Sequence, residues 1–325
     1  MEKILIKYID LLKKLRRAHN KSIGKAPHKP ILLVSIAQLI RNNSITSNKI
    51  FITPELVLAF KTNWKNFVET QHTPNFSLPF FHLKSEPFWN LVSKPGMQLA
   101  TTKSKSIKSF KNLNNTLAFA EIDKNLFQLL KDNETSLILE QFLLLHYFDV
   151  ASSSYLISQT SQLQLDIEHD ILNEDKETYI AKIKELQATL DEDNFQEEIY
   201  VRGGVFKKTI PKIYNHQCCI SDMKIESSSN AQMIDACHII PFSISQDDTI
   251  PNGISLSPNL HRAYDRGLIT INRDYIVRIS PTVIDNNSVY SISQFDGKQI
   301  NLPNNPKSYP SHESLIWHTK EVFQL

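Results

Sequence analysis

The sequence predicts an α+β protein of two domains, and three observations support this. The length of 325 residues is about twice that of a usual domain. Residues 1–150 mix apolar helical segments with short extended ones. Residues 201–325 begin with a basic helical segment and continue with a strand hairpin, a long loop, a short helix and further strands. Residues 151–200 are polar and acidic between them, which is typical of a helical connector.

The N-terminal domain contains apolar segments with helical spacing at residues 31–40, 54–67 and 137–148. Thr53 is a suitable N-cap for the second of these helices, and Pro54 suits its first position. Residues 76–83, with the sequence FSLPFFHL, are predicted to be extended. This domain is therefore expected to be mainly helical, with short strands.

Composition excludes some classes of protein. The sequence has no run of 18 or more apolar residues, so no membrane span is predicted. The three cysteines, of which Cys218 and Cys219 are adjacent, cannot build a disulfide framework, and a cytoplasmic location is expected. Residues 11–29 and 94–111 contain basic residues and no acids, and two such stretches together suggest a polyanionic partner. A solvated surface explains either stretch alone equally well.

Reactive side chains recur at fixed spacings in the C-terminal domain. The segments are DACHIIPF (residues 235–242), PNGISLSP (251–258) and HRAYDRGLIT (261–270). Ser257 and Pro258 predict the start of a short helix that Gly267 ends. His261 and Asp265 are four apart on this helix and share one face, which is the geometry needed to hold one metal ion.

These three segments resemble the HNH (ββα-metal) endonuclease family over about 65 residues. The resemblance implies that His238 is the general base that takes a proton from water, a task that suits an imidazole. It implies that Asn252 orients His238 from across the loop. It also implies that His261 binds a divalent metal, Mg²⁺ or Mn²⁺, which offsets charge on the scissile phosphate.

Two residues, Asp265 and Asp235, are candidates for the acidic ligand of that metal. Asp265 is paired with His261 on the helix, but it could instead be a partner of Arg262 or Arg266. Asp235 lies on the same strand face as Cys237, which immediately precedes His238 where many members of the family have an acid. A Cys₄ zinc site is not expected, because no pair of C-x-x-C motifs is present.

The N-terminal domain resembles the sulfur-binding domain of restriction enzymes that attack phosphorothioate-modified DNA. The matching elements are APHKPILL (residues 26–33), LPFFHL (78–83), Phe88-Trp89 and the late helix. A phosphorothioate keeps its charge but exposes a larger, poorly hydrated sulfur, so its reader should offer an apolar cup and neighbouring cations. The cup is expected from Leu78, Pro79 and Phe80, and the phosphate contacts from His28, Lys29, Arg16, Arg17 and Lys25.

The resulting prediction is a modification-dependent restriction endonuclease that binds phosphorothioate-modified double-stranded DNA and hydrolyses nearby phosphodiester bonds. Two cuts are needed for a double-strand break, so a homodimer is expected, with residues 151–200 as one possible interface. One alternative keeps the nuclease but lets the N-terminal domain read a methylated base or a specific sequence. Another is a DNA-binding protein with a silent nuclease domain.

Overall fold

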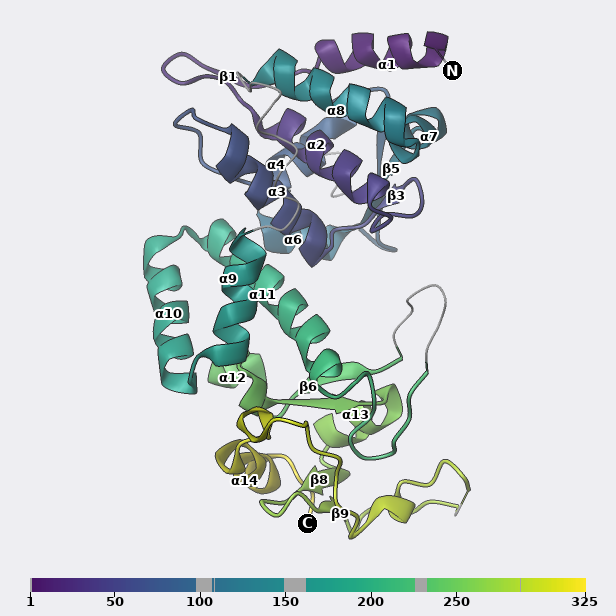
Figure 1. Ribbon diagram of the computed structural model, residues 1–325, viewed down its shortest axis with the longest axis vertical. Helices are drawn as coiled ribbons and strands as arrows, with labels where there is room; N and C mark the ends of the chain where they lie inside the picture. Colours follow the sequence, from purple (N-terminus) through teal and green to yellow (C-terminus); the bar gives the residue numbers. More distant parts are fainter. Residues whose placement is uncertain (1, 98–106, 108, 149–161, 226–232, 287) are drawn as a thin grey trace. The chain divides into compact units, whose positions relative to one another are not determined.

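The computed structural model describes residues 2–97, 107, 109–148, 162–225, 233–286 and 288–325 (Figure 1). The chain divides into two compact units, which are residues 1–165 with 189–201, and residues 166–188 with 202–325. Both mix helices with small antiparallel sheets, so the predicted α+β class is confirmed. Among the described residues, no helix combines the length and the apolar character that a membrane crossing needs.

The first unit is mostly helical, with one three-stranded sheet in the order β3-β5-β4 and a small β1-β2 hairpin. Its helices are α1 (Glu2–Lys13), α2 (His28–Arg41), α3 (Pro54–Phe67), α4 (Ser77–His82), α6 (Phe110–Thr116), α7 (Lys124–Lys131) and α8 (Asn133–Tyr147). Its strands are β1 (His19–Asn20), β2 (Gly24–Lys25), β3 (Lys49–Ile50), β4 (Trp89–Ser93) and β5 (Leu117–Ile122).

Helix α2 is the centre of this unit and is buried along most of its length. It packs against α3, α7 and α8, as the apolar run at residues 31–40 predicts. Helix α3 begins where the sequence places it, because the Thr53 hydroxyl accepts a hydrogen bond from the Leu56 N–H at 3.3 Å. The packing of α3, α7 and α8 against the buried α2 thus fixes where the loops between these helices begin and end.

The expectation that residues 76–83 are extended is wrong, because residues 77–82 form α4 and residues 83–85 a 3₁₀ turn. Pro79 occupies the third position of α4, where a helix has no intrahelical partner for an N–H. The side chain of Asn75 accepts from the Leu78 N–H at 2.9 Å, and Glu197 accepts from the Phe76 N–H at 2.9 Å. The start of this short helix is therefore capped from outside it, partly by a residue more than 100 positions away.

The second unit surrounds two hairpins, β6-β7 and β8-β9. The strands are β6 (Asp235–His238), β7 (Gly253–Leu256), β8 (Ile269–Ile271) and β9 (Val277–Ile279). The helices that lie wholly or partly in it are α9 (Gln162–Asn173), α10 (Lys176–Thr189), α11 (Glu192–Ile213), α12 (Phe242–Ser245), α13 (Pro258–Asp265) and α14 (His312–Glu321). Helix α13 starts after Ser257 and ends before Gly267, which has φ +67°, as the sequence predicts.

The acidic segment 151–200 is shared between the two units. Most of α9 and of α10 belongs to the second unit, whereas residues 189–201 belong to the first. Helix α11 supplies its first turns to the first unit and its later turns to the second. Residues 151–161 of the expected connector, and most of the basic stretch 94–111, lie outside the described residues.

Candidate functional site

The β6-β7 hairpin positions the central side chains of the second unit. The strands pair antiparallel with Cys237 opposite Ile254 and His238 opposite Gly253. Neighbouring residues of a strand point to opposite faces, so Cys237 and His238 face different surroundings. A Cβ at Gly253 would lie 2.4 Å from Cδ1 of Ile210, so a larger residue would force this side chain of α11 to shift away from the hairpin.

The imidazole of His238 is held on one face and at one nitrogen. Its ring stacks on Phe206 of α11, with centroids 3.8 Å apart and an interplanar angle of 5°. Its Nε2 lies 2.7 Å from Oδ1 of Asp248, whose side chain is 1% exposed, whereas that of His238 is 22% exposed. The Tyr179 hydroxyl donates to the other carboxylate oxygen of Asp248 at 3.1 Å. Burial raises the pKa of Tyr179, so this phenol stays protonated and remains a donor.

Asn252 is buried and closes the loop that follows His238. Its amide oxygen accepts from the Ile240 N–H at 2.9 Å, and its amide nitrogen donates to the carbonyls of Ile240 and Asp247, each at 2.9 Å. Its backbone carbonyl accepts from the Ile239 N–H. These bonds fix the path of the loop from β6 to Asp248, so Asn252 is placed to orient His238 through that loop.

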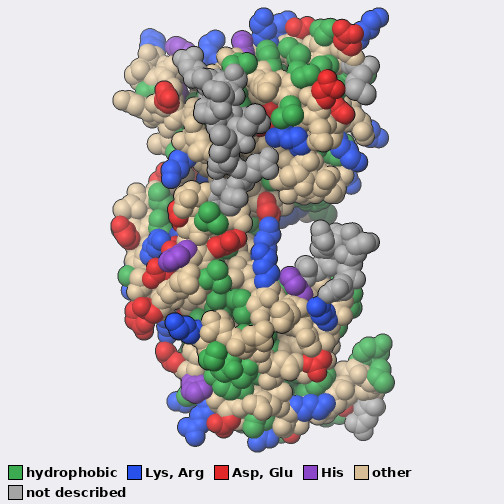
Figure 2. Space-filling view, viewed as in Figure 1, with side chains coloured by type: hydrophobic (Ala, Val, Ile, Leu, Met, Phe, Trp, Pro, Cys, Tyr) green, Lys and Arg blue, Asp and Glu red, His purple; other side chains and the backbone are tan. Residues whose placement is uncertain are grey.

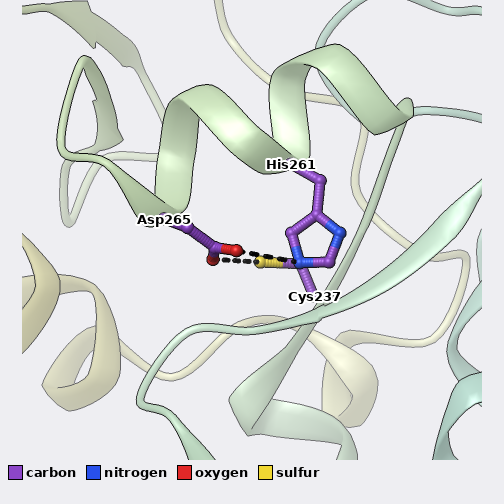
Figure 3. A group of neighbouring side chains, drawn as sticks. All are labelled: Cys237, His261 and Asp265. Atoms are coloured by element: carbon purple, nitrogen blue, oxygen red, sulfur yellow. Dashed lines mark hydrogen bonds and ion pairs between the residues drawn. The ribbon is translucent and has the colours of Figure 1, made fainter. Parts of the chain in front are cut away.

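A group of possible metal donors lies between β6 and α13 (Figure 3). Cys237, His261 and Asp265 each present a ligand atom, and these atoms all lie within 4.8 Å of one another. Nε2 of His261 is 3.5 Å from Oδ2 of Asp265, and the Cys237 thiol is 3.9 Å from Oδ1 of Asp265. Asp235 lies 3.2 Å from the other ring nitrogen, Nδ1 of His261. A thiol, an imidazole and a carboxylate at these separations fit one divalent cation, with Asp235 orienting the ring from behind.

A second group of acidic and histidine side chains occurs on α9 and comprises His169, Asp170 and Glu174. Asp170 already has two cationic partners, Lys182 at 2.6 Å and Arg202 at 3.0 Å. This group therefore reads as a structural ion-pair network beside Tyr179.

The expected sulfur cup is mostly enclosed. Phe80 is fully buried and packs against Phe76 and Trp89, whose indole N–H donates to the Phe80 carbonyl at 3.1 Å. Pro79 is also buried, whereas Leu78 is half-buried. Phe80 is thus a core residue and not a surface contact, and Leu78 is the member of the expected cup that reaches the surface.

Two of the expected cations differ from the sequence prediction. Lys29 is buried, and its ammonium lies 2.6 Å from Glu86 and 2.8 Å from the Ser85 hydroxyl, so it neutralises an internal carboxylate. His28 packs 4.5 Å from the Trp64 ring, and its Nε2 is 3.0 Å from the Thr73 carbonyl. Burial lowers the pKa of His28 to about 4, so the ring is neutral near pH 7.

The remaining expected cations are accessible to different degrees. Arg16 and Lys25 are exposed, whereas the guanidinium of the half-buried Arg17 lies 4.4 Å from the centre of the Tyr147 ring. On the face shown in Figure 2, Lys and Arg side chains of this unit lie in separate groups among acidic and hydrophobic ones. Any phosphate contact from these positions would therefore involve a few discrete cations.

Comparison with known proteins gives the two halves of the chain separate relatives. Residues 218–272 match the family described as HNH endonuclease, and residues 6–161 match the family described as ScoMcrA-like DNA sulfur-binding domain. The chain joins an HNH endonuclease domain to a DNA sulfur-binding domain. Both resemblances identified from the sequence are thereby confirmed, and HNH nucleases generally use a divalent metal.

Solved structures give weaker likenesses to this chain. One is titled as the type IV phosphorothioation-dependent restriction endonuclease ScoMcrA, at 11% identity and a TM-score of 0.35, covering 79% of this chain and 94% of that one. Another is titled as the modification-dependent TagI restriction endonuclease, at 18% identity and a TM-score of 0.29. That match spans 36% of this chain and only 37% of the other. No curated protein matches the chain.

Sequence reasoning missed two residues of this nuclease domain that contact the expected site. Asp248 is one of two acids between His238 and Asn252, and only the path of the loop brings it to Nε2 of His238. The sequence predicts no role for Cys237, which is buried with its sulfur 3.9 Å from Oδ1 of Asp265. The available signal for Cys237 was its place immediately before His238, where related sequences carry an acid.

Proposed function

We propose that this protein is a modification-dependent restriction endonuclease that binds phosphorothioate-modified DNA and hydrolyses nearby phosphodiester bonds. The observation that carries the nuclease half is a partly exposed imidazole paired with a buried carboxylate, next in sequence to Cys237, which forms a group of metal donors with His261 and Asp265 of α13. These features lie within the residues that match the HNH endonuclease family. The target half rests on the match of residues 6–161 to a DNA sulfur-binding domain.

His238 is the general base in this proposal. When Nε2 carries the proton and donates it to Asp248, the lone pair of Nδ1 is free to accept a proton from water. The carboxylate of Asp248 then stabilises the imidazolium that forms. Tyr179 and Phe206 keep this pair in place, the first by donating to Asp248 and the second by stacking on the ring.

His261 and Asp265 would hold the metal, and Asp235 would orient His261 from its other nitrogen. When bound, a divalent cation offsets negative charge on the scissile phosphate and the leaving 3′ oxygen. The chain itself supplies the base and its support: His238 removes the proton of the attacking water, and Asn252 fixes the loop that carries Asp248. The geometry thus favours Asp265 over Asp235 as the acidic ligand.

The reader half needs an apolar contact for the sulfur and cations for the flanking phosphates. Leu78 on α4 supplies accessible apolar surface over the buried Pro79. Arg16 and Lys25 supply exposed cations around the β1-β2 hairpin. His28 is neutral and contributes at most a polar contact.

Cleavage of matched plasmids tests the proposal. Plasmid with phosphorothioate linkages and unmodified plasmid are incubated with the full chain and a divalent metal, with and without EDTA. We expect metal-dependent cleavage of the modified plasmid, and a fall of about 10² to 10⁴ in the rate for His238→Ala. Equal cleavage of both plasmids would exclude a sulfur reader and favour a reader of a methylated base or a specific sequence. Unchanged cleavage by His238→Ala would remove the assigned base.

A double-strand break needs two cuts, so we also propose that the enzyme acts as a homodimer. Sedimentation analysis of the full chain with and without modified DNA tests this. A single nicked product together with a monomeric mass in both states would argue against it.

A further inference from the structure

The sulfur atom of Cys237 faces the expected metal position. Cys237 comes from β6, and His261 and Asp265 come from α13, so the strand and the helix together bring three ligand types to one place (Figure 3). The thiol approaches Oδ1 of Asp265 at 3.9 Å and its side chain has no exposed surface. A carboxylate and an imidazole are unusual neighbours for a thiol that only fills a core.

The two other cysteines provide a comparison. Cys218 and Cys219 are also buried, but among the residues that the structure describes they are not part of a group of metal donors. Of the three thiols, Cys237 is the one that the described structure places within 4.8 Å of both a histidine nitrogen and a carboxylate oxygen. Its position therefore distinguishes it from an ordinary buried cysteine.

The distances are close to those of a formed site. A tetrahedral ion with ordinary zinc bond lengths separates nitrogen from oxygen by about 3.3 Å and sulfur from oxygen by about 3.5 Å. Here Nε2 of His261 is 3.5 Å from Oδ2 of Asp265, and the Cys237 sulfur is 3.9 Å from Oδ1 of the same carboxylate. Rotation of this exposed carboxylate would bring a single oxygen toward both ligand atoms, which with one atom from each residue already lie within 4.8 Å of one another.

We propose that Cys237 is a thiolate ligand of the metal held by His261 and Asp265, and that the site consequently selects Zn²⁺ or Co²⁺ over Mg²⁺. Thiolate and imidazole are preferred by zinc and similar ions, whereas Mg²⁺ and Ca²⁺ take oxygen ligands almost exclusively. Three protein ligands leave a fourth position of a tetrahedral ion for water or a phosphate oxygen. The thiol proton passes to the buffer when the metal binds. This inference rests on the proposed nuclease site and replaces the Mg²⁺ or Mn²⁺ expected from the sequence.

Cobalt absorption of the metal-free full chain tests the inference directly. A Co²⁺–thiolate bond produces a charge-transfer band in the near ultraviolet, which nitrogen and oxygen ligands do not produce. We expect this band in the wild-type protein and in the matched controls Cys218→Ser and Cys219→Ser, and its loss in Cys237→Ala. Calorimetric titration should show Zn²⁺ binding that weakens by at least about 10-fold in Cys237→Ala, and little binding of Mg²⁺.

Several outcomes would overturn the proposal. These are Co²⁺ binding without the charge-transfer band, a band that survives in Cys237→Ala, or tighter binding of Mg²⁺ than of Zn²⁺. If Cys237→Ala fails to fold, the wild-type spectrum and Cys237→Ser decide, because serine keeps the size of the side chain. A band that depends on Cys237 without cleavage in any metal would sink the proposed nuclease and leave this site standing. Mg²⁺-dependent cleavage that Cys237→Ala retains would overturn the thiolate ligand and leave the proposed nuclease standing.

Discussion

Glu197 on α11 offers a sharp test of the electrostatics of the first unit. Its side chain is fully buried, and Oε1 accepts from the Phe76 N–H at the start of α4. Among the described atoms, Oε2 has no hydrogen-bond partner. Burial raises the pKa of Glu197 from 4.5 to about 7, an effect that Lys61 opposes and that Asp191 and Asp193 reinforce. Glu197→Gln removes the ionisable group but keeps the acceptor for Phe76.

The expected gain follows from the difference between the two pKa values. A carboxyl whose pKa is raised on folding stabilises the folded state below its unfolded pKa, and this contribution is lost as the pH rises through the folded value. The interval from 4.5 to about 7 corresponds to about 3 kcal/mol once Glu197 is ionised in both states. Glutamine has no such penalty. The free energy of unfolding of Glu197→Gln should therefore be higher than that of the wild type at both pH values. The difference should be less than about 1 kcal/mol at about pH 5 and about 3 kcal/mol at about pH 9.

Urea denaturation at a series of pH values measures this difference. Tryptophan fluorescence reports on the first unit through the buried Trp64 and Trp89. The matched control is Glu192→Gln, an exposed glutamate on the same helix, which should change stability little at any pH. A constant difference between Glu197→Gln and the wild type across this pH range would refute the assignment of a buried carboxyl that ionises near neutrality.

Two further predictions concern the second unit. Asp248→Asn should lower kcat of DNA cleavage by about 10- to 100-fold with little change in KM, because the imidazolium of His238 loses its anionic partner. If Asp248→Asn lowers kcat equally in a protein that already carries His238→Ala, Asp248 does not act through His238. Gly267→Ala should lower the thermal stability by about 1–3 kcal/mol, because φ is +67° and the new Cβ would meet the Val322 carbonyl at 2.0 Å. Gly297→Ala, with φ +75° and nothing within 4 Å, is its matched control and should cost less, so equal losses would contradict the role of that contact.

Local sequence signals predicted several elements correctly because their causes are local. Thr53 caps α3 with its own hydroxyl, and Gly267 ends α13 with a positive φ. The prediction for residues 76–83 was wrong because the cause of this helix is not local. The aromatic pattern has no helical spacing, and Glu197, far along the chain, accepts the hydrogen bond from the Phe76 N–H at the start of the helix. The sequence also predicted no role for the C-terminal tail. His318 of α14 stacks on Tyr264, with ring centroids 3.6 Å apart, and this contact joins residues that are distant in the sequence.

The sequence by itself indicated the two domain families, and it predicted His238, Asn252 and His261 as site residues, because both inferences depend on residue type and spacing. It also determined the pairing of His261 with Asp265, because four residues on a helix always share a face. Only the tertiary structure brought Asp248 to the imidazole of His238, and the Cys237 sulfur to His261 and Asp265. It also buried Lys29 against Glu86, 57 residues away. Hydrogen bonds and ion pairs across folded loops depend on where the backbone leads, and spacing along a chain does not encode that path.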